Sequence, residues 1–274
     1  MTDIAVLQMT AGIDPAANAD TLEQAVAQAK ARGAAMLFTP EMSGLIDRDR
    51  ARAADKLMPE DEDLVLRRVR AVAAEHGLWV HIGSLAIRRA DGRLANRAYV
   101  IDDRGDIRAH YDKMHLFDVD LPSGESWRES ASYAPGEQAV VVDTPVGRLG
   151  LAICYDLRFP ALFAALTEAG ATILSVPAAF TRPTGAAHWH VLLRARAIEA
   201  GVHLVAPAQT GDHQDGRATY GHSLVVGPWG EVLLDMGEAA GLGLATIDAG
   251  QVEAVRARLP AIRHRRTIGP VARA

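Results

Sequence analysis

The chain has 274 residues, of which 49% are hydrophobic and 23% are charged, and its formal net charge is -5. This apolar fraction supplies a packed core and excludes a disordered chain. The acidic balance argues against a nucleic-acid-binding surface, because phosphate binding needs clustered, unbalanced Lys and Arg. The basic stretch IRHRR at residues 262–266 is the exception, and we interpret it as a solvated or subunit-contacting tail.

Apolar residues recur along the chain at strand and helix spacings. In chain order they predict a strand at 4–9, a helix at 16–31, a strand at 35–38, a helix at 64–76, strands at 78–87, 94–101 and 106–111, a polar loop at 114–133, strands at 139–143 and 148–153, a helix at 160–169, a strand at 171–176, a helix at 186–200, strands at 202–208, 223–226, 231–235 and 242–247, and a last short helix. This alternation, without a linker, predicts one α/β domain over residues 1–274 with mixed sheets and outer helices. A long ordered loop such as 114–133 is often functional in compact enzymes.

The N-terminal segment carries Asp3 where a secretion signal would carry positive charge, and no apolar stretch approaches the ~20 residues that a membrane span requires. We therefore expect a cytoplasmic protein that contacts no membrane. Cys154 is the only cysteine, which excludes an internal disulfide and a Cys-rich zinc site. Inert packing and nucleophilic chemistry remain as its two possible roles.

Cys154 stands in the segment AICYDLRFP, at the end of a predicted strand and just before a helix. Open α/β sheets expose their functional groups at this position. We expect the helix N-terminus to favour the thiolate and to lower the pKa of the thiol. The alternative is that the thiol packs as a small hydrophobe, as free cysteines usually do.

A nucleophilic cysteine needs a base and a group that holds the oxyanion. Glu41 follows a predicted strand in LFTPEMSG, where we expect burial to raise the pKa of its carboxyl toward that of a useful base. Lys113 follows a hairpin strand in AHYDKMHLFD and places an ammonium near a developing alkoxide. Each alone is more often solvated than catalytic, but with Cys154 they occupy equivalent positions at strand ends.

Four separated motifs, TPE at Glu41, YDKMHLFDVD around Lys113, WRES at Glu129 and CYDLRFP at Cys154, resemble the nitrilase superfamily of carbon-nitrogen hydrolases. The resemblance continues to the last helix. It implies a four-layer α-β-β-α sandwich, a catalytic triad of Glu41, Lys113 and Cys154, and no cofactor. It also implies pairing into a homodimer or a higher homo-oligomer.

The resemblance further implies how the site residues act. Cys154 is expected to attack an amide carbonyl, and Glu41 is expected to take the thiol proton and pass it to the leaving group. Lys113 and the backbone N–H of Tyr155 are expected to hold the oxyanion. Glu129 matches the second glutamate of the family and is expected to orient Lys113 and the substrate amide.

Other residues near the nucleophile are candidates for substrate binding. Arg158 is expected to receive a substrate carboxylate through its planar guanidinium, and a structural ion pair with Asp156 or Glu129 is the open alternative. Phe180 and Thr184, together with Tyr220, are expected in the pocket wall, although such side chains are more often simply packed.

The segments HLFDVD, CYDLRFP, HWHVLLRARAIE and RATYGHS are most similar to the branch that contains deaminated glutathione amidase and omega-amidase. We therefore expect hydrolysis of a terminal carboxamide of a small anionic substrate to acid and ammonia through a thioester, with deaminated glutathione as the first candidate. The alternatives are alpha-ketoglutaramate, another amide or nitrile, or a catalytically silent binding protein. His190 stands where both relatives typically have Glu, which leaves the substrate open.

Several histidines in the second half of the chain raise the alternative of a metal hydrolase. His188 and His190 are two residues apart, which directs them to different faces of a helix, and no HExxH spacing occurs. We therefore expect no catalytic metal.

Overall fold

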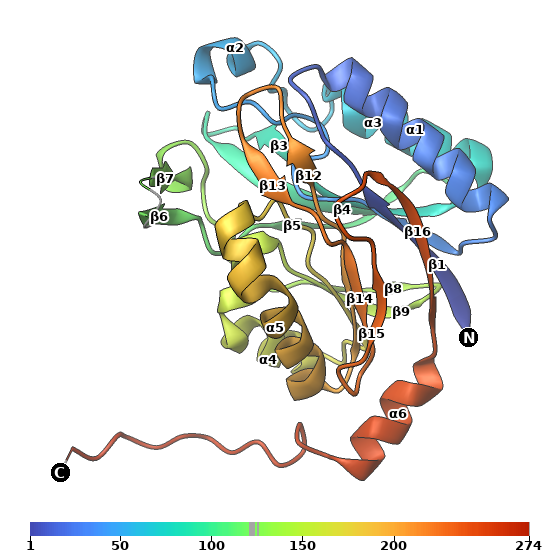
Figure 1. Ribbon diagram of the computed structural model, residues 1–274, viewed down its shortest axis with the longest axis vertical. Coiled ribbons are helices and arrows are strands. Elements are labelled where there is room, and N and C mark those ends of the chain that lie inside the picture. Colours follow the sequence, from blue (N-terminus) through green and yellow to red (C-terminus); the bar gives the residue numbers. More distant parts are fainter. Residues whose placement is uncertain (121–123, 125, 274) are drawn as a thin grey trace.

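The computed structural model describes residues 1–120, 124 and 126–273. Two six-stranded sheets form the centre of the molecule, and helices cover their outer faces (Figure 1). This is the expected four-layer α-β-β-α sandwich, and the fold prediction is confirmed. Among the described residues, no helix is long and apolar enough to cross a lipid bilayer.

The first sheet has the strand order β16-β1-β2-β3-β4-β5. Its strands are β1 (Thr2–Gln8), β2 (Met36–Phe38), β3 (Trp79–Arg88), β4 (Leu94–Ile101), β5 (Ile107–Asp112) and β16 (Gly241–Ile247). β1, β2 and β3 run parallel, and the remaining pairs are antiparallel. Two helices, α1 (Pro15–Ala31) and α3 (Leu64–His76), bury their apolar sides in a common cluster with this sheet.

The second sheet has the strand order β15-β14-β11-β10-β9-β8. Its strands are β8 (Val141–Thr144), β9 (Gly147–Leu151), β10 (Ile173–Ser175), β11 (His203–Ala206), β14 (Leu224–Val226) and β15 (Val232–Asp235). The helices α4 (Pro160–Glu168) and α5 (Arg182–Ala200) pack on it. Its apolar side chains join those on the inner face of the first sheet, such as Ile4, Phe38 and Val100, in one cluster.

Segments outside the two sheets complete the fold. They are α2 (Arg50–Ala54), the pair β12 (Thr210–Asp212) and β13 (Ala218–Tyr220), and α6 (Ala249–Arg258), after which the chain runs away from the body toward the C-terminus (Figure 1). The short elements α2, β12 and β13 had no apolar periodicity of sufficient length to be predicted.

The polar segment 114–133 is not a plain loop, and that expectation is wrong. It contains the hairpin of β6 (Asp118–Asp120) and β7 (Ser126–Arg128) and the 3-10 turn η1 (Glu129–Ala131). Residues 121–123 and 125 of the expected loop lie outside the described residues. Polar contacts support the hairpin, such as the ion pair of Arg128 Nη2 with Asp120 Oδ2 at 2.8 Å, so hydrophobic periodicity gave no signal of it.

Candidate active site

Glu41, Lys113 and Glu129 come together in the interior of the molecule. Glu41 follows β2, Lys113 directly follows β5, and Glu129 begins η1. Lys113 Nζ lies 3.0 Å from Glu41 Oε1 and 2.9 Å from Glu129 Oε2. The side chains of Lys113 and Glu41 are only 2% and 6% exposed, so this is a desolvated group of two carboxylates around one ammonium.

Asn96 on β4 links the two carboxylates and was missed in the sequence. Its Nδ2 donates to Glu41 Oε1 at 2.9 Å and to Glu129 Oε1 at 3.0 Å. The second Glu41 oxygen, Oε2, accepts from the backbone N–H of Ala179 at 2.9 Å. Asn96 lies mid-strand in LANRAYVI without a motif of its own, so only the strand pairing that sets it beside Lys113 could have revealed it.

Cys154 opens the five-residue 3-10 turn η2 (Cys154–Arg158), which follows β9 after two residues. Its backbone has φ of 50°, a left-handed conformation that non-glycine residues rarely adopt. Its backbone N–H donates to Pro177 O at 2.9 Å, and its thiol contacts the carboxylate of Glu41. The turn therefore directs the buried thiol toward Glu41 and Lys113.

The pKa values of this group follow from burial and from the shared charges. Burial raises the pKa of the Glu41 carboxyl, but the charge of Lys113 and hydrogen bonds from Cys154, Lys113 and Asn96 outweigh it and leave that pKa below 4.5. Burial and the charge of Glu41 raise the pKa of the Cys154 thiol well above 9.0. Burial lowers the pKa of Lys113, but Glu129 and Glu41 raise it well above 10.5.

Two expectations about these pKa values are therefore wrong. The pKa of Glu41 falls instead of rising, because an ammonium lies against the carboxylate. The pKa of Cys154 rises instead of falling, because the thiol is buried beside a carboxylate and only a short 3-10 turn follows it. The arrangement holds a neutral thiol against an ionised carboxylate, which is a nucleophile beside its base.

Asp156 fixes the turn that carries the thiol. It is fully buried, and its Oδ2 accepts from Tyr111 Oη at 2.7 Å and from the backbone N–H of Ile153 at 2.9 Å. Its Oδ1 contacts the backbone N–H of His115 at 3.0 Å and His115 Nδ1 at 2.7 Å. One carboxylate thus ties the turn of Cys154 to residues on both sides of Lys113.

Tyr155 and Arg158 lie on the same turn. No backbone acceptor within the described chain takes up the N–H of Tyr155. Arg158 makes no ion pair with Asp156, Glu129 or any other described carboxylate. Its guanidinium carbon instead lies 5.9 Å from the centre of the Tyr155 ring and 5.7 Å from that of Phe180. The structural ion pair considered for Arg158 is absent from the described part of the molecule, and its charge is left for another partner.

Phe180 and Thr184 lie on the α5 side of the site. Phe180 is 7% exposed and packs between Arg158 and Trp189. Thr184 Oγ1 bonds to Thr181 Oγ1 at 2.8 Å within the first turn of α5. Phe180 thus lies next to a candidate substrate contact, whereas the hydroxyl of Thr184 is engaged within its own helix.

Comparison with known proteins agrees with this geometry. Residues 3–257 match the carbon-nitrogen hydrolase family. The chain is 38% identical to deaminated glutathione amidase of Yersinia enterocolitica, over 97% of this chain and 93% of the relative. It is 42% identical to the human protein of the same name, over 96% of this chain and 82% of the relative.

Solved structures show the same fold. The NitFhit protein of Caenorhabditis elegans superposes with a TM-score of 0.89 at 38% identity, over 97% of this chain and 65% of that larger one. An amidase from Nesterenkonia, solved with acrylamide added at its active-site cysteine, superposes with a TM-score of 0.79 at 30% identity, over 95% and 98% of the two chains. The chain therefore belongs to the carbon-nitrogen hydrolase family and is an amidase that hydrolyses carbon-nitrogen bonds.

Proposed function

We propose that this enzyme hydrolyses deaminated glutathione, with Cys154 as nucleophile, Glu41 as general base and acid, and Lys113 as oxyanion donor. The observation that carries the catalytic assignment is the buried Glu41 carboxylate, which contacts the Cys154 thiol and lies 3.0 Å from Lys113 Nζ. Relatives of that name at 38% and 42% identity support the substrate.

In the first half of the reaction, Cys154 Sγ bonds to the amide carbonyl carbon while Glu41 accepts the thiol proton. The carbonyl oxygen becomes an oxyanion that the Lys113 ammonium and the Tyr155 N–H stabilise. The N–H of Cys154 itself already donates to Pro177 O, so Tyr155 is the better-placed backbone donor. Each preorganised donor lowers the barrier by about 3 kcal/mol.

The tetrahedral intermediate collapses when Glu41 passes its proton to the amide nitrogen. The carbon-nitrogen bond breaks, the amine leaves and a thioester remains on Cys154. Glu41 then removes a proton from water, which attacks the thioester carbonyl. The acid leaves, and the proton returns to Cys154 Sγ. Glu129 and Asn96 hold Lys113 and Glu41 in place through the contacts described above.

The chemistry of deaminated glutathione sets the leaving group. Both of its amides are secondary amides. Cleavage of the amide between the keto acid and the cysteine therefore releases cysteinylglycine. The primary amide alpha-ketoglutaramate instead releases ammonia. The terminal carboxamide and the ammonia expected from the sequence therefore fit alpha-ketoglutaramate and not deaminated glutathione. Both substrates carry carboxylates, and Arg158 is the proposed carboxylate receptor because no described acidic side chain neutralises it.

Comparing kcat/KM for deaminated glutathione and alpha-ketoglutaramate tests the proposal. We expect cysteinylglycine release from the first to exceed ammonia release from the second, and Cys154→Ala to abolish both. A preference for alpha-ketoglutaramate would instead identify an omega-amidase. Turnover of neither substrate, or an undiminished rate in Cys154→Ala, would overturn the proposed function.

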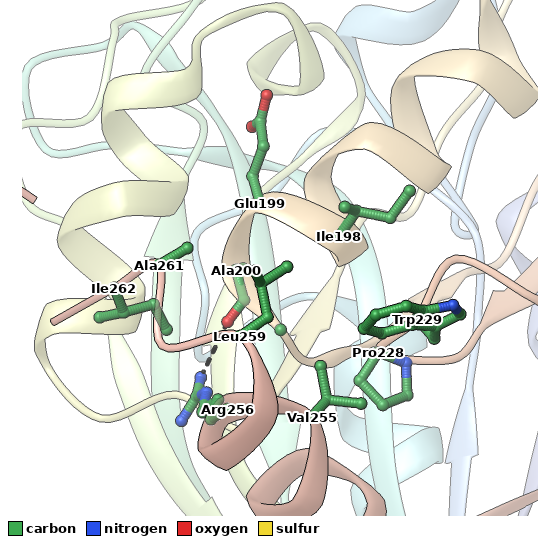
Figure 2. Close-up of a pocket in the computed structure, with 11 residues that line it drawn as sticks. Ile198, Glu199, Ala200, Pro228, Trp229, Val255, Arg256, Leu259, Ala261 and Ile262 are labelled. Atoms are coloured by element: carbon green, nitrogen blue, oxygen red, sulfur yellow. Dashed lines mark hydrogen bonds between the residues drawn. The ribbon is translucent and has the colours of Figure 1, made fainter. Parts of the chain in front are cut away.

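We also propose that the enzyme assembles as a homodimer or a higher homo-oligomer. Apolar side chains are exposed where α5 meets the β14–β15 turn and α6, including Ile198 (44%), Trp229 (63%) and Leu259 (51%). Figure 2 shows these three around one pocket, with Pro228 and Val255 between them. A second copy covering this face would bury them. Light scattering on the purified protein tests this, and a monomeric mass would contradict it.

We propose a cytoplasmic location because of the chemistry of Cys154. The mechanism needs Cys154 as a free thiol, and reducing compartments keep thiols free. Cell fractionation tests this, and recovery from an oxidising compartment would contradict it.

A further inference from the structure

A second group of reactive side chains lies outside the proposed catalytic residues. His190 is on α5, His222 lies between β13 and β14, and Asp235 is the last residue of β15. His190 Nε2 is 3.0 Å from Asp235 Oδ2, and His222 Nδ1 is 2.9 Å from Asp235 Oδ1. One potential ligand atom from each of the three residues lies within 4.8 Å of the others.

Contacts with other residues hold the three side chains, and the ring of His190 lies edge-on to Tyr220 with ring centres 6.1 Å apart. His222 stacks on Tyr220 with ring centres 4.5 Å apart, and its backbone carbonyl accepts from Trp189 Nε1 at 2.8 Å. Asp235 Oδ1 also accepts from the backbone N–H of Gly237 at 2.9 Å. Such surrounding contacts orient metal ligands in proteins.

The donor set is that of a transition-metal site. Two imidazole nitrogens and one carboxylate oxygen suit zinc and its neighbours, with the remaining coordination positions filled by water. Each imidazole nitrogen lies about 3 Å from one Asp235 oxygen, and side-chain rotations would bring one atom of each residue to the usual bond length of ~2.0–2.2 Å from a single ion. The side chains of His190, His222 and Asp235 are 32%, 21% and 35% exposed, which leaves a path from solvent.

We propose that His190, His222 and Asp235 bind one zinc-like divalent cation that fastens α5 to the end of β15. The histidines of this half of the chain raise the alternative of a catalytic metal, but the sequence does not predict this grouping. Asp235 lies 45 residues from His190 and 13 from His222, and neither interval matches a metal motif. The ion takes no part in the amide chemistry, since it contacts none of Glu41, Lys113 or Cys154. Without an ion, the same geometry is a hydrogen-bonded His-Asp-His group, and the experiment distinguishes the two.

The test is zinc binding to chelator-stripped full-length protein, measured by equilibrium dialysis with elemental analysis. The background variant Cys154→Ser removes the one thiol that could compete for zinc. We expect one zinc per chain at neutral pH, and an affinity at least tenfold weaker in His190→Gln and in Asp235→Asn. His110→Gln, which removes an exposed imidazole on β5, is the matched control and should bind as the background does.

Two further measurements test metal binding independently, in case a variant folds poorly. Zinc should raise the Tm of the background protein and leave the Tm of His190→Gln unchanged. Cobalt(II) should give the visible absorption of a low-symmetry nitrogen and oxygen site in the background protein alone. Absence of stoichiometric zinc, equal affinity in His190→Gln, or loss of binding only in His110→Gln would each overturn the proposal.

Discussion

Lys113 Nζ lies 3.0 Å from Glu41 Oε1 in a nearly dry environment, and Glu129 presents a second carboxylate at 2.9 Å to the same ammonium. One buried positive charge therefore pairs with two carboxylates. Breaking a buried ion pair leaves its partner unpaired in a medium of low dielectric. The members of this group should consequently differ in what they contribute to stability, even where they contribute equally to catalysis.

Lys113→Met should destabilise the protein more than Glu41→Gln does. The first change leaves two buried carboxylates without a counter-charge and should cost about 3–5 kcal/mol of unfolding free energy. The second leaves Lys113 paired with Glu129 and should cost less. Both should lower kcat/KM by about 10²–10⁴-fold. Denaturant unfolding and amidase assays on the same preparations check this, with the exposed Glu137→Gln as control.

Equal stability losses in the two variants would contradict the charge balance described here. Retention of activity in Glu41→Gln would remove Glu41 as the base, whatever its effect on stability.

The pH dependence of kcat/KM should be flat through the neutral range. The active form has an ionised Glu41 and a neutral Cys154, whose pKa values lie below 4.5 and above 9.0. Activity should fall only as pH drops below 4.5 or rises above 9.0. A deaminated glutathione whose thiol is blocked by methylation is the suitable substrate, because its own thiol cannot titrate. An acid limb near pH 6 would show that another group controls the base.

Glu41 should also make stability depend on pH on the acid side. Its pKa is lower in the folded protein than in the unfolded chain, so its contribution is fully present above pH 4.5. That contribution disappears as pH falls through the folded-state pKa. The stability difference between the wild type and Glu41→Gln, measured by unfolding in urea, should therefore shrink below pH 4.5. A difference that is constant with pH would contradict the lowered pKa.

The sequence predicted those parts of the fold that depend on repeating apolar patterns. The helix at 64–76 and the strand at 94–101 have the predicted bounds, because continuous apolar faces of α3 and β4 pack on other layers. The β6–β7 hairpin was missed because polar side chains support it. Pattern methods detect burial, and this hairpin buries little.

The candidate site shows the same division. Glu41, Lys113, Glu129 and Cys154 stand in recognisable motifs, and the structure brings them together. The directions of their pKa shifts could not be predicted from the sequence. Each direction depends on the charged group that the fold places beside the residue, such as Lys113 beside Glu41. Asn96 acts through a single amide in a regular strand, so it carries no local signature.

Arg158→Gln should raise KM for deaminated glutathione about tenfold and change kcat little. A hydrogen bond to a charged group contributes about 1.5–3 kcal/mol, and the half-buried position of Arg158 favours the lower end. Arg158→Lys should restore only part of the affinity, because an ammonium lacks the planar pair of donors. Steady-state kinetics check this, with an uncharged aliphatic amide as control substrate. If KM rises equally for deaminated glutathione and for the uncharged amide, Arg158 does not bind a substrate carboxylate, and its role is to pack on Tyr155 and Phe180.

Asp156 should act as a positioning residue that couples the nucleophile to the lysine. Its carboxylate accepts from Tyr111 and Ile153 on one oxygen and contacts His115 on the other. In Asp156→Asn, one oxygen becomes an NH2 group that faces donors, which should cost about 1–3 kcal/mol. The turn of Cys154 then shifts relative to Lys113, and a displacement near 1 Å should lower kcat about 10²-fold.

The two effects of Asp156→Asn can be separated with Tyr111→Phe, which removes a single hydrogen bond to Oδ2 and leaves the other contacts. A positioning role requires kcat to fall in both variants, with the smaller loss in Tyr111→Phe, while KM stays near the wild-type value. The exposed Asp143→Asn, which breaks a surface pair with Arg148, should change neither kcat nor KM. A displaced turn would move the Cys154 thiol relative to Lys113 and would lower kcat. If Asp156→Asn unfolds more readily but keeps the wild-type kcat, the turn has not shifted and Asp156 contributes to stability alone.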